Sequence, residues 1–379
     1  MALIDPTELN LEIMMIGGRR TGKTSVLAAM QDCFDKVFGR SDIVCSTGGE
    51  TTLDVIEQKR QEMNDYLALA SQNKDFVPDG TPTSGDDTYT FDVFLKKKRK
   101  DKIHLNFYDF PGEFIENRGD DIKAKIAESH VLMIVIDTPY LMEDDGQYND
   151  RRNCCYRITE MIKDSLDVND MDLPKLVLFV PLKCEKYFWE KRMNEVIAAV
   201  KKQNAYGSLI DYLSSGDDVN CEVAITPILT IGTAIFSRFE RDSETHEYIM
   251  NEADKYPSNP LYYFSEQARA AAVNQGVEQK YAAEPKYCEQ PLVYTLSYAL
   301  QMMADTIDKG EPEISILGKI FNTTPIARAF KYIKENWLNF AAAKDFIDQR
   351  KKIRSHLVGN KAKDGFAILS DPLKFKAGA

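Results

Sequence analysis

The pattern G-x-x-x-x-G-K-T occupies Gly17-Gly18-Arg19-Arg20-Thr21-Gly22-Lys23-Thr24, directly after the apolar run Leu11-Glu12-Ile13-Met14-Met15-Ile16. A phosphate-binding loop has this sequence and this position, between a buried strand and the start of a helix. Its glycines let successive backbone N–H groups converge on an anion, and the helix N-terminus adds a partial positive charge. Lys23 is spaced to reach the β- and γ-phosphates, and the Thr24 hydroxyl to ligate Mg²⁺. We therefore predict that a nucleotide phosphate is bound by Gly17, Gly18, Arg19, Arg20, Thr21, Gly22, Lys23, Thr24 and Ser25.

The composition is that of a globular protein, with 379 residues of which 44% are apolar and 28% charged. A net charge of −11 argues against broad nucleic-acid binding. The seven cysteines are scattered and form no C-x-x-C pair, which favours reduced thiols. The N-terminus does not resemble a signal peptide, and no apolar run reaches the roughly 18 residues of a membrane span. These features predict a cytoplasmic protein without a membrane span.

Strand-like and helical patterns alternate along the chain, which predicts an α/β fold with a mostly parallel sheet. Apolar runs predict strands at 10–16, 89–95, 103–108, 131–136, 176–180 and 223–229. Helical spacing predicts helices at 22–38, 51–72, 119–129, 150–165, 186–213 and 291–308. The basic run 96–102 between two of the strands favours a solvated hairpin turn over a nucleic-acid patch.

A second motif, Asp109-Phe110-Pro111-Gly112-Glu113, follows the predicted strand 103–108. It resembles the D-x-x-G motif of TRAFAC/Ras-like GTPases, whose sheet also has two hairpin-joined strands after the first helix. The D-F-P-G-E form resembles bacterial TRAFAC-associated double-GTPase proteins, which are often switches in conflict or signalling operons. The resemblance, which covers residues 10 to about 305, implies a Ras-like P-loop NTPase fold: a mostly parallel sheet with one antiparallel strand and flanking helices. A helical C-terminal extension, which the resemblance does not cover, follows this domain. The resemblance also implies that Asp109 holds Mg²⁺ through a water and that the Gly112 N–H contacts the γ-phosphate.

Three further roles follow from this resemblance. Glu113 stands where many such GTPases place a water-orienting Gln, and a carboxylate there could orient or deprotonate the attacking water. Pro82-Thr83-Ser84-Gly85 resembles the P-T-x-G form of Arf-like GTPases, so Thr83 is the predicted second Mg²⁺ ligand and Thr81 the alternative. Arg19 could act as a built-in arginine finger, block an external finger by its bulk, or point into solvent. Lys23, Glu113, Arg19 and Thr83 are thus the candidate catalytic residues, and Thr24, Thr83 and Asp109 the candidate metal ligands.

The base-recognition motif departs from the family pattern [N/T]-K-x-D, because its place after the strand 176–180 reads Leu182-Lys183-Cys184-Glu185. Lys183 matches the lysine that lies along the base. Glu185 could accept the guanine N1–H and N2–H groups, although its extra methylene shifts the geometry. The loop at Thr230–Ala234, in particular Thr233 and Ala234, resembles the loop that contacts guanine O6. GTP is favoured over ATP as the bound nucleotide.

The chain divides into a predicted GTPase domain, 1–310, with insertions in the switch region and after residue 232, and a helical, basic extension, 311–379. Apolar residues from Ile326 to Ile347 recur at helical spacing, and lysines occupy the opposite face. This helix either packs on the domain or docks on an acidic partner or a membrane surface.

Two functional hypotheses follow. The first is a Mg²⁺-dependent GTPase switch that hydrolyses GTP slowly and signals to a protein partner. The second is a scaffold that holds GTP or ATP with little hydrolysis and presents its C-terminal helix to a partner.

Overall fold

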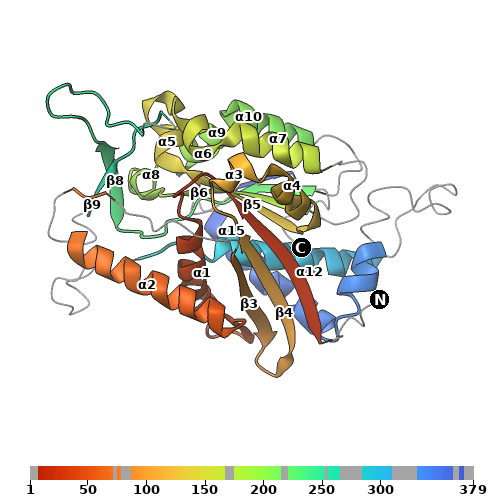
Figure 1. The fold of residues 1–379 in the computed structure, drawn as a ribbon. Helices are drawn as coiled ribbons and strands as arrows, with labels where there is room; N and C mark the ends of the chain where they lie inside the picture. The colour runs from red at the N-terminus through yellow and green to blue at the C-terminus, as the bar shows by residue number, and fades with distance from the viewer. Residues whose placement is uncertain are drawn as a thin grey trace.

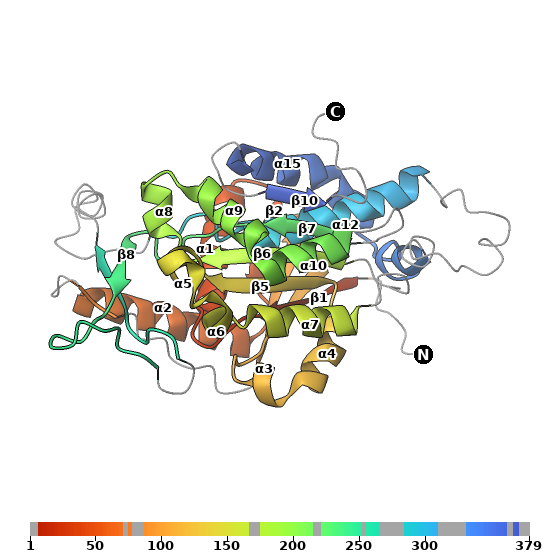
Figure 2. The same cartoon turned by 90° about the horizontal axis from the view of Figure 1, so that it is seen from above.

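The structure is a computed structural model that describes residues 7–70, 75–77, 87–166, 175–214, 221–251, 255–264, 284–309, 331–361 and 367–370. Within these residues, an eight-stranded sheet lies between two layers of helices (Figure 1 and Figure 2). None of the helices described has both the length and the apolar character needed to cross a bilayer.

The large sheet has the order β10-β7-β6-β5-β1-β4-β3-β2. Its strands are β1 Glu8–Ile16, β2 Ile43–Thr47, β3 Asp87–Leu95, β4 Lys98–Asp109, β5 Val131–Asp137, β6 Lys175–Leu182, β7 Cys221–Ile225 and β10 Ala367–Ser370. The five strands β7, β6, β5, β1 and β4 are parallel neighbours, whereas β3 is antiparallel to both β4 and β2. The predicted mostly parallel sheet with one antiparallel strand in its first half is thus confirmed, and β10 adds a second antiparallel strand at the far edge.

The helices cover both faces of this sheet. They are α1 Lys23–Phe38, α2 Glu50–Ala70, α3 Phe114–Asn117, α4 Gly119–Glu128, α5 Thr138–Met142, α6 Asn149–Asn153, α7 Cys155–Ser165, α8 Glu185–Trp189, α9 Met193–Lys202, α10 Asn204–Ser214, α12 Gln290–Lys309 and α15 Ala343–Lys361, with a 3-10 turn at Asp144–Gly146 and a π-helical turn η2 at Ile333–Trp337. One core cluster joins α1, α12, η2 and α15 to the sheet, and the other joins α4, α7 and α10 to its opposite face.

The central strands bury both of their faces, which explains their continuous apolar sequences. In β5, Val131, Met133 and Val135 belong to the first cluster, and Leu132, Ile134 and Ile136 to the second. The strand is therefore fully buried, in contrast to the hairpin strand β4, whose first residues are exposed. The exposed basic turn between β3 and β4 agrees with the predicted hairpin.

Several elements differ from the sequence prediction. Cys154 has a left-handed φ of 53°, which divides the predicted helix 150–165 into α6 and α7. The predicted helix 186–213 is three helices, and strand β7 ends at Ile225 instead of residue 229. After Gly232, the strands β8 Ala234–Phe239 and β9 Pro260–Phe264 form a separate antiparallel hairpin. This hairpin also bridges Phe76, whose N–H and C=O bond Tyr262.

The C-terminal segment packs on the sheet, as far as it is described. Trp337, Phe340 and Phe346 are buried in the cluster that contains α1 and α12. The helical spacing predicted from Ile326 to Ile347 begins outside the described residues, and the described part is interrupted between η2 and α15. The division of the chain at residue 310 stays a prediction.

Candidate functional site

Five loops meet at the carboxyl ends of the parallel strands. They follow β1, β4, β5, β6 and β7, and they begin at Gly17, Phe110, Thr138, Lys183 and Thr226. In open α/β sheets, ligands bind at the carboxyl ends of the strands, at the point where successive strands of the chain are added on opposite sides of a central strand. Here that central strand is β1, which lies between β4 and β5.

The loop after β1 has the backbone conformations that its glycines permit. Gly22, at the start of α1, has φ 103°, which is strained for any other residue. A Cβ atom on Gly17 would lie 2.7 Å from the Val135 carbonyl oxygen. A Cβ on Gly18 would overlap the Arg152 carbonyl oxygen. The loop therefore lies flat against β5 and α6.

Lys23 lies inside this loop. Its Nζ donates hydrogen bonds to the carbonyl oxygens of Gly17 (3.2 Å) and Gly18 (3.3 Å). Burial lowers the pKa of Lys23, and the carboxylates of Asp109 and Glu113 partly oppose that effect. A phosphate bound beside Lys23 would favour the charged ammonium form, because a nearby negative charge opposes the effect of burial. The site therefore suits an anionic ligand.

Thr24 and Asp109 join α1 to the end of β4. The Thr24 Oγ1 donates a 2.6 Å hydrogen bond to Asp109 Oδ2. Asp109 is 1% exposed, and its buried Oδ1 accepts no hydrogen bond from any described residue. Burial raises the pKa of this carboxyl. A hydroxyl and a buried carboxylate oxygen beside a phosphate loop are oxygen ligands of the kind that Mg²⁺ prefers, so the residues present fit this ion.

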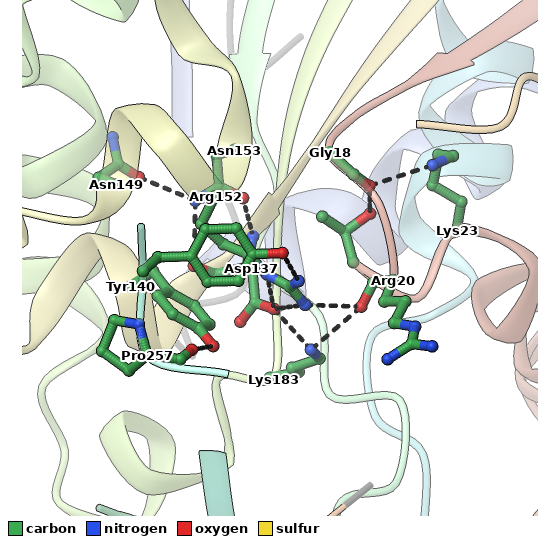
Figure 3. A network of polar contacts seen from close by, with 12 residues as sticks. Gly18, Arg20, Lys23, Asp137, Tyr140, Asn149, Arg152, Asn153, Lys183 and Pro257 are labelled. Carbon is green, nitrogen blue, oxygen red and sulfur yellow. Dashed lines mark hydrogen bonds and ion pairs between the residues drawn. The ribbon is translucent and has the colours of Figure 1, made fainter. Parts of the chain in front are cut away.

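The D-F-P-G-E segment lies directly on the phosphate loop. A Cβ atom on Gly112 would overlap the main chain of Arg19, so only glycine allows this approach. The Glu113 carboxylate is 3.9 Å from the Arg19 Nε, and both side chains are half exposed. The Arg20 side chain is also exposed and extends away from the buried polar network beside it (Figure 3). Ser25 is exposed in the first turn of α1.

The base-recognition residues lie on the other side of the loop. Lys183, with a left-handed φ of 59°, donates to Asp137 Oδ2 (2.6 Å) and to the Arg20 carbonyl oxygen (3.5 Å). Glu185 is 2% exposed, and its Oε1 accepts the N–H groups of Ile231 (3.1 Å) and Gly232 (3.0 Å). Burial raises the pKa of Glu185, against the effect of these two N–H groups.

The loop after β7 thus contacts Glu185 through residues earlier than those predicted to meet the base. Thr233 is buried, and Ala234 begins β8, where it pairs with Phe264. Thr83 and its alternative Thr81 lie outside the described residues.

Two buried residues of the site were not expected from the sequence. Asp137 ends β5, and Arg152 lies in α6; the Arg152 Nη2 donates to Asp137 Oδ2 (2.9 Å) and to the Arg20 carbonyl oxygen (3.0 Å). The only sequence signal was an aspartate at the end of a fully apolar strand, a common position for functional side chains in α/β folds.

His130 is a structural histidine. Its Nδ1 accepts the Glu12 N–H (3.0 Å), and its Nε2 lies 2.9 Å from the Tyr332 hydroxyl. Burial lowers its pKa to about 3, so the ring is neutral.

The chain matches one family of GTPases. The family model named Double-GTPase 2 matches residues 12–211, a span that contains the phosphate loop, the D-F-P-G-E segment and Glu185. No curated protein matches the sequence. Among solved structures, one match is the Saccharomyces cerevisiae Ski7 GTPase-like domain bound to GDP and inorganic phosphate, with 15% sequence identity and a TM-score of 0.29. The match covers 66% of this chain and 47% of that chain, so it spans less than half of the Ski7 chain.

Proposed function

This chain belongs to the Double-GTPase 2 family and is a GTP-binding protein, and we propose that it is a Mg²⁺-dependent molecular switch that hydrolyses GTP slowly. The observation that carries the proposal is the buried Asp109, which is hydrogen-bonded to Thr24 and has a second oxygen, beside the phosphate loop, that no described residue bonds. An unpaired buried oxygen costs free energy, so a cation ligated by this oxygen beside the phosphate loop would be favoured.

The roles of the residues follow from phosphoryl-transfer chemistry, in which catalysis is mostly positioning and charge stabilisation. Lys23 and the loop N–H groups hold the phosphates, while Thr24 and Asp109 hold Mg²⁺, with Thr83 as the further ligand. Mg²⁺ bound there would neutralise phosphate charge. The main chain of Gly112 lies directly against the phosphate loop. This position suits a backbone N–H that donates a hydrogen bond to the γ-phosphate when GTP is bound. Glu113 then orients the attacking water.

The contact between Arg19 and Glu113 bears on the hydrolysis rate. At 3.9 Å the two charges attract, and both side chains are solvated enough to separate at small cost. A γ-phosphate would compete with Glu113 for Arg19, which would release the carboxylate toward the water. Arg19 is accordingly proposed as an assisting cation, and a slow intrinsic rate is expected because Arg19 must exchange Glu113 for the γ-phosphate before the carboxylate can orient the water.

Guanine is proposed as the base, read by Lys183 and Glu185. Lys183 lies against the phosphate loop at the Arg20 carbonyl, and the buried Glu185 carboxylate organises the loop after β7. The extra methylene of Glu185 leaves ATP as the alternative ligand. Signalling to a protein partner and a place in a bacterial conflict or signalling operon belong to the same proposal.

The test is fluorescence titration of the purified chain with mant-GTP and mant-ATP, with and without Mg²⁺. We expect tight GTP binding that requires Mg²⁺ and is abolished in Lys23→Ala. GTP affinity that is unchanged in Lys23→Ala would overturn the assignment of the phosphate loop. A preference for ATP would overturn the base assignment alone.

A scaffold that barely hydrolyses its nucleotide is the second candidate, and the paired state of Glu113 favours it. Single-turnover hydrolysis by wild type and Glu113→Ala separates the two functions. A switch loses rate in the variant, whereas a scaffold shows the same negligible rate in both proteins.

A further inference from the structure

A buried charge cluster supports the phosphate loop from the side opposite to Asp109. Its centre is Asp137, which is fully buried at the end of β5. Asp137 Oδ2 accepts hydrogen bonds from Lys183 Nζ (2.6 Å) and from Arg152 Nη2 (2.9 Å) and Nε (3.2 Å). Figure 3 shows the two cations converging on this carboxylate from α6 and from the end of β6.

Arg152 is held in this position by more than the carboxylate. Its guanidinium lies 5.0 Å from the centre of the Tyr140 ring and 5.3 Å from that of Tyr256, and its Nη1 donates to the Tyr256 hydroxyl (3.3 Å). Burial alone would lower the pKa of Arg152, but Asp137, Tyr140 and Tyr256 together outweigh that effect and raise the pKa. The side chain is therefore a permanently charged, immobilised donor, 7% exposed.

The cluster is directed at one peptide group of the phosphate loop. The Arg20 carbonyl oxygen accepts from Arg152 Nη2 (3.0 Å) and from Lys183 Nζ (3.5 Å). Arg20 has a left-handed φ of 56°, a conformation that costs free energy for a residue other than glycine and persists only when neighbours enforce it. The C=O and N–H of a trans peptide point in opposite directions. Holding the Arg20 carbonyl toward the cluster therefore turns the Thr21 N–H away from it.

The main chain of α6 acts on the same loop. The Arg152 carbonyl group lies where a Cβ atom of Gly18 would be, so α6 packs directly on the loop backbone. Asn153 fixes α6 to β5, because its side chain accepts the Asp137 N–H (2.7 Å) and donates to the Asp137 carbonyl (3.2 Å). Arg152 therefore contacts the phosphate loop twice: its side chain bonds the Arg20 carbonyl, and its backbone packs on Gly18.

We propose that Arg152 is a positioning residue for nucleotide binding, which holds the Arg20–Thr21 peptide so that the Thr21 N–H faces the polyphosphate. It acts through the loop and does not touch the nucleotide. This inference rests on the proposed function, since the polyphosphate is that of GTP or GDP. Lys183 shares the task, but it lies at the base motif, whereas Arg152 has no part in reading the base.

The test compares Arg152→Met, which keeps the bulk and removes the charge, with Arg152→Lys, which keeps the charge and can reach fewer acceptors. Arg151→Met is the matched control, because Arg151 is the exposed neighbour in α6 and bonds the Lys255 carbonyl instead. Dissociation constants of mant-GDP and mant-GTP with Mg²⁺ are measured together with the melting temperature of each free protein.

In Arg152→Met we expect weaker binding of both nucleotides by about tenfold or more, the effect of one charge-assisted hydrogen bond, with the GTP-to-GDP ratio unchanged. Arg152→Lys should recover part of the affinity, and Arg151→Met should equal wild type. A double variant with Lys183→Met should lose less than the sum of the two single effects, because both cations act on the same carbonyl.

Two results would overturn the inference. One is wild-type affinity in a folded Arg152→Met protein, and the other is fully additive losses in the double variant, as general destabilisation would give. If Arg152→Met does not fold, Arg152→Lys decides: unchanged affinity at an unchanged melting temperature contradicts the positioning role. Failure of the wild-type chain to bind GTP or GDP would overturn the proposed function and this inference with it.

Discussion

Replacing Asp109 with Asn should change the free and the nucleotide-bound protein in opposite directions. In the free protein, Asp109 is a buried carboxylate whose Oδ1 accepts from none of the residues that the structure describes, and burial raises its pKa. Asp109 has an ordinary pKa of 3.8 in the unfolded chain and a higher pKa in the folded protein. It therefore lowers the free energy of unfolding as the pH rises above 3.8, because the carboxyl ionises in the unfolded chain before it does so in the folded protein. Asn removes that charge, and its side-chain oxygen can still accept from Thr24.

The size of both effects can be estimated. The amide nitrogen of Asn would take the place of Oδ1 and would also lack a partner, but an unpartnered buried atom costs more when it is charged, so the free variant should gain on the order of 1 kcal/mol of stability. With an unfolding entropy of about 2.1 cal/mol/K per residue, this corresponds to a rise in melting temperature of about 1–3 °C for a chain of this length. In the complex, losing an interaction with a charged group should weaken Mg²⁺-dependent GTP binding by about 10- to 150-fold.

The assay is differential scanning fluorimetry of the free protein at neutral pH, combined with mant-GTP titration over a range of Mg²⁺ concentrations. Asp92→Asn is the matched control, because Asp92 is also a buried strand carboxylate but both of its oxygens are partnered, by Lys102 and His104. The control should lower the melting temperature and leave the Mg²⁺ dependence intact. A lower melting temperature of free Asp109→Asn together with an unchanged Mg²⁺ requirement would refute the assignment of a metal ligand.

Three further predictions concern other parts of the chain. A Cβ at Gly112 would overlap the Arg19 main chain, so Gly112→Ala should reduce the preference for GTP over GDP by about tenfold, measured by competition with mant-GDP; an unchanged preference would count against γ-phosphate sensing. The hydrogen bond to Asp92 raises the pKa of His104, so its contribution to stability is complete below pH 6.5 and is lost as the pH rises through the raised value. In His104→Gln the melting temperature should no longer fall as the pH rises above 6.5. The same pH dependence in the variant and in wild type would contradict a stabilising contact between His104 and Asp92. Trp337→Ala should cost about 3–5 kcal/mol in urea denaturation, because the indole is 1% exposed beside the His130 ring; a loss below 1 kcal/mol would mean that the C-terminal segment is not part of the core.

The elements that the sequence predicts well are those whose environment is uniform. The strands β5 and β6 are buried on both faces, so each is an almost continuous apolar run. By contrast, β2 has the sequence Ile-Val-Cys-Ser-Thr, which is short and half polar because it lies at an edge. The break at Cys154 could not be predicted, because the helical spacing continues through it. The helix before the break, α6, packs on β5 and on the phosphate loop, and local sequence does not report such contacts.

The candidate site divides in the same way. The phosphate loop and the D-F-P-G-E segment are contiguous in sequence, so their spacing already carries the chemistry. Arg152 lies in the run Asn149-Asp150-Arg151-Arg152-Asn153, whose composition is typical of a solvated surface. Its burial depends on Asp137 and on the rings of Tyr140 and Tyr256, which come from three other segments of the chain, and no local pattern predicts such a set of partners. The role of Thr83 stays a prediction.

The edge strand β10 has a consequence for the order in which the protein folds during synthesis. It pairs with β7, but the two strands are separated by more than 140 residues of chain, from Ile225 to Ala367. At roughly 5–20 residues per second, a ribosome needs about 7–28 s to add that length. During this interval the main-chain groups on the outer side of β7 have no strand to pair with, and unpaired edges of this kind recruit other chains. Nascent chains of this protein therefore carry a sheet edge open to aggregation until residues 367–370 emerge, well after the phosphate loop has been synthesised.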